Sequence, residues 1–252
     1  MKNYSDSEVY DAEYSFDYDM NFWKKYCQKS GNSVLELGCG TGRLGIPLSE
    51  TGFDYVGLDN SIEFIKSAKI KAQNLKKSPK FYIKNMCNFK LNQKFHTIIM
   101  PFNAFFHLMT DKELKACLNT VKKHMFHSSY FIVDVLNFDM SFFCRDKNEI
   151  GFIRGNDDRP IVFKTKSGKL FKKSQAITYS KKAQTFEVFW YHNFIKPKRK
   201  YNVSFKFRYY FPQELRMILE NNGFEIKKEY GFFDSSSFKS DSPNQILILK
   251  KS

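Results

Sequence analysis

The chain has 252 residues, of which 42% are hydrophobic, so it can bury the core of one α/β domain with an insertion, or of two small domains. This composition excludes a disordered chain, and the lack of any apolar run near 18 residues excludes a membrane-spanning helix. The net charge of +15 favours contact with phosphates, nucleic acids or acidic metabolites, although a solvated lysine-rich surface also accounts for it.

The N-terminus and the cysteines indicate the compartment. The first 17 residues are acidic and lack the apolar segment of a signal peptide. The five cysteines are widely spaced and form no C-x-x-C pair, which argues against a disulfide framework or a structural zinc site. We therefore expect a cytoplasmic protein without a bound metal.

Helices and strands are predicted to alternate as far as residue 137. The helical spacing of apolar residues in MNFWKKYCQ predicts a first helix, which Gly31 ends. Further helices are predicted at 42–52, 61–77 and 110–125, and strands at 33–37, 54–59, 80–86, 95–101 and 129–137. This alternation predicts a doubly wound parallel sheet, which binds its ligand beyond the carboxyl ends of its strands.

The pattern changes after about residue 145. Apolar and polar residues alternate at period two in five segments, which predicts an antiparallel sheet of four or five strands. A helix at 212–224 and two closing strands then return to the earlier α/β pattern. We therefore predict a seven-stranded Rossmann-like domain from residues 1–149 and 212–252, with residues 150–211 as an inserted antiparallel β-sheet.

The glycine-rich stretch VLELGCGTGRLG fits two cofactors. A dinucleotide would use Gly40, Gly42 and Gly45, but its turn would then begin two residues late. In the other register the strand carries Glu36 and the turn opens at once with Gly38. A carboxylate there repels a pyrophosphate and suits the cationic S-adenosylmethionine, which carries no phosphate. We therefore favour S-adenosylmethionine.

The motifs also resemble a known family. VLELGCGTGRL followed by VGLDNS is similar to motifs I and II of the class I S-adenosylmethionine-dependent methyltransferases. NMCNF, KFHTIIMPFNAFFHL and the C-terminal RYYFPQELRMILENNGFEI resemble later segments of a small-molecule-type subgroup that has an inserted antiparallel β-sheet. VYDAEYSFDYDMNFW resembles the N-terminal segment of that subgroup, which folds over the methionine part of the cofactor. The resemblance thus covers nearly the whole chain.

The resemblance implies roles for particular residues. Asp59 is expected to hold the ribose, and Tyr10 is a candidate to close over the site. Asn85 stands where the family has an aspartate at the adenine amino group, and its amide oxygen can still accept that hydrogen bond. The implied cofactor-binding residues are Tyr10, Glu36, Gly38, Cys39, Gly40, Gly42, Asp59, Asn60, Asn85, Met86, Phe102 and Asn103.

The acceptor is less constrained by the sequence. His107, just past the fourth strand, is the candidate catalytic base, although a histidine there can equally serve a loop. Tyr191 and His192 either line the acceptor pocket or occupy a solvent face of the inserted sheet, and Arg208 either grips an acidic substrate or forms a surface salt bridge. We predict methyl transfer to an O or N of a small molecule, for which an acidic compound is one candidate.

Two alternatives stay open. The basic run KPKRK and the net charge suit an RNA or protein methyltransferase, although the run also reads as a solvated turn. A non-catalytic S-adenosylmethionine-binding protein is the other alternative. The inserted sheet is a candidate lid over the acceptor and a candidate contact in a homodimer.

Overall fold

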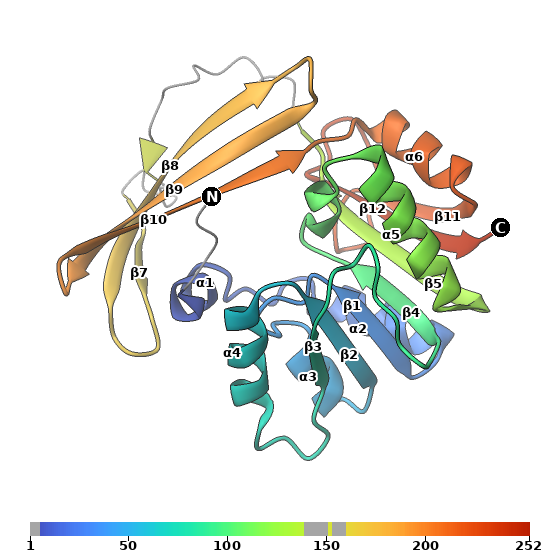
Figure 1. Cartoon of the computed structure of the whole chain (residues 1–252), viewed down its shortest axis with the longest axis horizontal. Helices are drawn as coiled ribbons and strands as arrows, with labels where there is room; N and C mark the ends of the chain where they lie inside the picture. Colours follow the sequence, from blue (N-terminus) through green and yellow to red (C-terminus); the bar gives the residue numbers. More distant parts are fainter. Residues whose placement is uncertain (1–5, 139–150, 153–159) are drawn as a thin grey trace. The chain divides into compact units, whose positions relative to one another are not determined.

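The computed structural model describes residues 6–138, 151–152 and 160–252. Two compact units divide the chain, and each is described by itself (Figure 1). The first unit comprises the described residues of Met1–Ser15 and Asp139–Tyr209, and the second comprises Phe16–Phe138 and Tyr210–Ser252. Residues 6–15 thus group with the inserted sheet, whereas the sequence grouped them with the glycine-rich region. The domain bounds predicted from the sequence stay a prediction.

The second unit is built on a mixed sheet of seven strands in the order β11-β12-β5-β4-β1-β2-β3. The strands β1 to β5 run parallel to their neighbours, and β12 and β11 join antiparallel at the β5 edge. Their bounds are β1 (Ser33–Leu37), β2 (Asp54–Asp59), β3 (Lys80–Ile83), β4 (Phe95–Met100), β5 (Met125–Leu136), β11 (Phe224–Tyr230) and β12 (Asn244–Lys251). The predicted Rossmann-like methyltransferase sheet is confirmed.

Two helices of this unit begin at residues whose side chains cap them by hydrogen bonds. The Ser61 side chain accepts a hydrogen bond from the Phe64 N–H, and Thr110 and Glu113 form a capping box. The helices are α2 (Met20–Ser30), α3 (Gly45–Glu50), α4 (Ile62–Ala72), α5 (Asp111–Lys123), α6 (Pro212–Asn221) and the 3₁₀ helix η1 (Ala104–His107). The N-caps are thus Ser61 and Thr110, the residues at which the sequence predicted these two helices to begin.

The core of this unit lies between the sheet and its helices. On one face, α2, α3 and α4 bury a cluster that includes Trp23, Leu48 and Ile65 against alternate residues of the strands, such as Val34 and Ile99. Helices α5 and α6 contact β5 and β11 respectively. These helices pack on the sheet. Because its central strands are parallel, the loops that follow them gather at its carboxyl edge.

The first unit is an antiparallel sheet with one short helix, α1 (Ser7–Glu13). Figure 1 shows three long strands, β8 (Leu170–Ser180), β9 (Thr185–Lys196) and β10 (Arg199–Arg208), paired in sequence order. The short β7 (Val162–Lys164) and β6 (Gly151–Phe152) pair with β8. The rest of the strand predicted at residues 150–155 lies outside the described residues.

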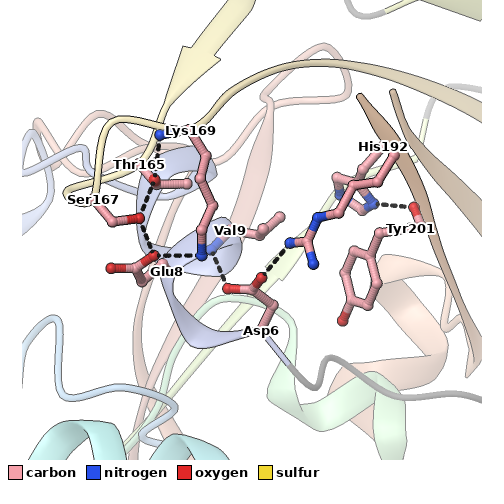
Figure 2. Close-up of polar contacts among 9 residues, drawn as sticks. Asp6, Glu8, Val9, Thr165, Ser167, Lys169, His192 and Tyr201 are labelled. Atoms are coloured by element: carbon pink, nitrogen blue, oxygen red, sulfur yellow. Dashed lines mark hydrogen bonds and ion pairs between the residues drawn. The ribbon is translucent and has the colours of Figure 1, made fainter. Parts of the chain in front are cut away.

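Acidic side chains of α1 and of its N-cap residue bind this helix to the sheet. Figure 2 shows Glu8 directed at Ser167 and Lys169, at distances of 2.6 and 3.0 Å. Asp6 receives a hydrogen bond from Arg199 at 2.8 Å. A helix of seven residues is too short to be stable alone, so these contacts and the burial of Val9 hold it in place.

Candidate functional site

The turn after β1 is closed by hydrogen bonds to β2. The Gly38 and Cys39 N–H groups both donate to the Leu58 carbonyl, at 2.8 and 3.0 Å. The Gly40 N–H donates to Asp59 Oδ2 at 2.9 Å, and the Gly42 N–H donates to the Cys39 carbonyl. Four amide groups of the glycine-rich turn therefore already have acceptors inside the protein, so they are not available to a pyrophosphate.

The glycines of this turn are required by its backbone. Gly38, Gly40 and Gly42 have φ of +80°, +55° and +86°, which residues other than glycine seldom adopt. Gly45, which the dinucleotide register would assign to a cofactor, serves packing instead, because a Cβ there would overlap the Tyr55 ring. The arrangement fits the register that opens at Gly38.

Glu36 places a carboxyl group at the carboxyl end of β1. Its side chain is buried and accepts a hydrogen bond from the Tyr55 hydroxyl. Burial raises the pKa of Glu36 to about 7, against the lowering effects of the Tyr55 hydrogen bond and the charge of Arg43. A cation bound nearby would favour the charged form of Glu36, so this residue suits the ammonium and sulfonium groups of S-adenosylmethionine.

Asp59 ends β2 beside the glycine turn. Its two oxygens accept hydrogen bonds from the Gly40 and Ser61 N–H groups, at 2.9 and 2.8 Å. Desolvation raises the pKa of Asp59 although these backbone bonds lower it. Each carboxylate oxygen has two lone pairs, so capacity remains for two ribose hydroxyl groups. These acceptor oxygens thus fit the cofactor, and Asp59 is its proposed ribose ligand.

The residues proposed for the adenine side follow β2 and β3. Asn60 is exposed directly after Asp59, and Asn85 is exposed two residues past β3. The Asn85 side-chain oxygen accepts the Cys87 N–H at 2.7 Å, which fixes the turn that carries Met86. Because β2 and β3 are parallel neighbours, these residues follow the same edge of the sheet. Their contacts with adenine stay a prediction.

The connection after β4 has an unusual backbone. Phe102 and Asn103 have φ of +52° and +63°, and Phe102 is 37% exposed. The Phe102 N–H donates to Asp134 Oδ2 at 2.9 Å, and the Asn103 side-chain oxygen accepts the Leu136 N–H at 2.7 Å. β4 pairs with β1, so this turn and the glycine turn follow adjacent strands at one edge.

His107 ends the 3₁₀ helix that follows this turn. The residue as a whole is exposed, whereas desolvation lowers the pKa of its imidazole to about 4. The ring is therefore mostly neutral at pH 7. A neutral imidazole is the form that accepts a proton, so His107 keeps its proposed role as base.

Tyr10 and the inserted strands belong to the other unit. Tyr10 lies on α1 with its ring 4.7 Å from that of Tyr14, and its role at the cofactor stays a prediction. His192 is fully buried, so the interpretation of this position as part of a solvent face is wrong. Its Nε2 lies 2.5 Å from Glu13 Oε1, and its Nδ1 lies 3.0 Å from the Tyr201 carbonyl, the contact drawn in Figure 2.

One cluster near the glycine turn was missed at the sequence level. Arg43 donates to both oxygens of Asp19 at 2.7 Å, and its guanidinium lies 4.3 Å from the centre of the Phe16 ring. The Phe16 ring in turn lies 5.6 Å from that of Phe102. Arg43 therefore ties the segment before α2 to the glycine turn. Its adjacency to the glycine motif was the available signal, but nothing local identified Asp19 as its partner.

Known proteins resemble part of this chain in sequence. Residues 34–126 match the family model described as a methyltransferase domain. A methyltransferase of Geobacillus sp. (strain WCH70) is 24% identical over 52% of this chain and 56% of its own length. A glycine/sarcosine N-methyltransferase of Aphanothece halophytica is 26% identical over 47% of this chain and 46% of its own length. The chain thus spans about half the length of these curated relatives.

Solved structures match over almost the whole chain. An S-adenosylmethionine-dependent methyltransferase from Clostridium acetobutylicum has a TM-score of 0.80 at 16% identity, covering 98% of this chain and 97% of the other. An amino pentose methyltransferase from Micromonospora echinaspora, solved with S-adenosylmethionine bound, has a TM-score of 0.70 at 14% identity, covering 100% and 99%. At these identities the likeness establishes the fold.

Two features are absent from the described residues. No group of histidine, cysteine and acidic side chains that could hold a metal ion is found among them. None of the helices in the described parts is long and apolar enough to cross a membrane. The chain thus carries a match to a methyltransferase domain over residues 34–126, and its fold is that of S-adenosylmethionine-dependent methyltransferases.

Proposed function

We propose that this protein transfers a methyl group from S-adenosylmethionine to a nitrogen or oxygen of a small molecule, with an amine as the first class to test. The observation that carries the proposal is the match to an amino pentose methyltransferase over the full length of both chains, inserted sheet included. The similarity to a glycine/sarcosine N-methyltransferase supports the same acceptor chemistry.

When bound, S-adenosylmethionine supplies a methyl group on a sulfonium, which is already a good leaving group. The residues of this chain bind and orient. Asp59 would accept hydrogen bonds from the ribose hydroxyls, and the carboxylate of Glu36 would face the cationic part of the cofactor. Alignment of the two reactants and exclusion of water are the main contributions expected of a protein in such a displacement.

The acceptor must lose a proton as it gains the methyl group. An amine can release this proton to water after the transfer, whereas a hydroxyl gains from a base during it. His107 is the proposed base because it follows β4 and its ring is mostly neutral at pH 7. The proton would pass from the acceptor to the imidazole and then to solvent.

The experiment is a release assay for S-adenosylhomocysteine with matched acceptors. Glycine, sarcosine and amino sugars would be compared with the corresponding hydroxy compounds, and Asp59→Ala would serve as the control with weakened cofactor binding. Turnover with at least one amine or hydroxyl acceptor supports the proposal.

Other outcomes separate the alternatives. Transfer of labelled methyl only to RNA or to protein in a cell extract would replace the small acceptor with a macromolecule. Tight S-adenosylhomocysteine binding with no transfer to a whole metabolite extract would indicate a non-catalytic binding protein.

A further inference from the structure

Two consecutive residues, neither of them glycine, adopt left-handed backbone angles directly after β4. They are Phe102 and Asn103, with φ of +52° and +63°. Asparagine tolerates this conformation, but phenylalanine adopts it only at an energetic cost, because its Cβ crowds the following carbonyl oxygen. Such strain persists only where the surrounding structure fixes it, and it is concentrated at functional sites. The residues that hold this turn therefore bear on what the turn does.

Asp134 makes two of the hydrogen bonds that hold the turn. Its side-chain Oδ2 accepts the Phe102 N–H at 2.9 Å, and its backbone carbonyl accepts the Asn103 N–H at 3.1 Å. Its second side-chain oxygen, Oδ1, accepts a hydrogen bond from Asn244 Nδ2 at 2.8 Å. Asp134 thus joins the strained turn to β12, a strand far away in the sequence.

The two side-chain partners of Asp134 are both donors. A carboxylate satisfies two donors, whereas an amide or a protonated carboxyl group would turn an N–H or O–H toward one of them. The side chain is buried in the middle of the sheet, beside the charges of Asp19 and Arg43. Burying a carboxylate is unfavourable, so its use here needs a reason beyond packing.

We propose that Asp134 is a positioning residue that sets the cofactor affinity by fixing the Phe102–Asn103 turn through its carboxylate. The turn follows β4, the neighbour of β1, and presents the partly exposed Phe102 ring beside Phe16. A loosened turn would let Phe102 leave its left-handed conformation and withdraw this surface from the cofactor. The inference rests on the proposed function and on the expectation from the sequence that Phe102 and Asn103 line the cofactor site.

The test is an exchange of donor and acceptor between Asp134 and Asn244. In Asp134→Leu both donors lose their acceptor oxygens, and in Asn244→Asp two carboxylates face each other. In the double variant Asp134→Asn/Asn244→Asp, the amide oxygen accepts the Phe102 N–H and the amide NH₂ donates to the new carboxylate. The double variant therefore restores both hydrogen bonds with the partners reversed.

Calorimetric titration with S-adenosylhomocysteine and thermal unfolding would be measured on all four proteins. We expect Asp134→Leu to weaken binding about tenfold or more, and the double variant to return to within about threefold of the wild type. Glu229→Gln is the matched control, because Glu229 also accepts an amide hydrogen bond, from Gln245, but has no such bond to the turn. It should lower the unfolding temperature and leave the affinity unchanged.

Two results would overturn the inference. One is wild-type affinity in Asp134→Leu. The other is a double variant that regains thermal stability but not affinity, since Asp134 would then act only on stability. A wild-type protein that fails to bind S-adenosylhomocysteine would instead remove the proposed function, and this inference with it.

Discussion

Lys173 Nζ lies 2.5 Å from Glu13 Oε2, although the two side chains are only 7% and 2% exposed. The ammonium also lies 4.2 Å from the centre of the Trp190 ring, and the other Glu13 oxygen contacts His192. Desolvation lowers the pKa of Lys173 while Glu13 opposes this shift. A buried charged group thus connects the last residue of α1 to β8 and β9, and it makes the N-terminal helix part of the inserted-sheet unit.

Glu13→Gln should destabilise this unit. Removing one partner leaves Lys173 buried without a compensating charge, which costs about 3–5 kcal/mol in comparable pairs. The matched control is Glu8→Gln on the same helix, whose pair with Lys169 is about one third exposed and should contribute no more than about 1 kcal/mol. Urea unfolding followed by tryptophan fluorescence, which reports on Trp190, would measure both. Equal effects of the two substitutions would contradict the burial argument.

Acid should release the same cluster. Burial alone would raise the pKa of Glu13, but the His192 hydrogen bond and the Lys173 charge together lower it. A lowered carboxyl pKa contributes stability that is present above the unfolded value of 4.5 and is lost as the pH falls through the folded value. We therefore expect this contribution to disappear below about pH 4.5, and Glu13→Gln to lack that acid-induced step.

Glu36 should make stability depend on pH in the opposite sense. Its raised pKa of about 7 means that its contribution is fully present below 4.5 and is lost as the pH rises toward 7. The shift corresponds to roughly 3 kcal/mol. The free energy of unfolding should therefore fall across this range more in the wild type than in Glu36→Gln. Parallel pH profiles of the two proteins would show that Glu36 is not the buried acid described here.

Asp59→Ala should weaken cofactor binding at least tenfold. The change removes the acceptor proposed for the ribose hydroxyls, worth about 1–3 kcal/mol, and also the anchor of the Gly40 N–H. Asp54→Ala, at the other end of the same strand, removes an exposed carboxylate and is the control. Calorimetry with S-adenosylhomocysteine gives both affinities, and an unchanged value for Asp59→Ala would count against the assigned site.

His107→Gln should lower kcat about 10²-fold with a hydroxyl acceptor, because it removes the proposed base. With an amine acceptor the loss should be much smaller, since the amine needs no base during the transfer. Similar losses with both acceptor classes, or none with the hydroxyl, would place His107 outside the chemistry.

Local features were predictable from the sequence. The caps at Ser61 and Thr110, the glycine turn and the period-two strands follow from neighbouring residues, and the structure has them. The pairs that join distant parts of the chain were not predictable from the sequence. Asp134 and Asn244 are 110 residues apart, and Glu13 and Lys173 are 160 apart, so no local pattern joins them. An aspartate inside the apolar run FIVDV was the one signal of Asp134, because charged residues seldom occupy buried strands without a partner.

The choice between the two cofactors is the point on which the account depends most. The amide groups of the glycine turn donate hydrogen bonds to Leu58, Asp59 and Cys39, and the buried carboxyl group of Glu36 lies just before the turn. Parallel calorimetric titrations of the full chain with S-adenosylhomocysteine and with NADH test this directly. The account predicts saturable binding of S-adenosylhomocysteine and none of NADH. Tight binding of NADH without binding of S-adenosylhomocysteine would contradict it.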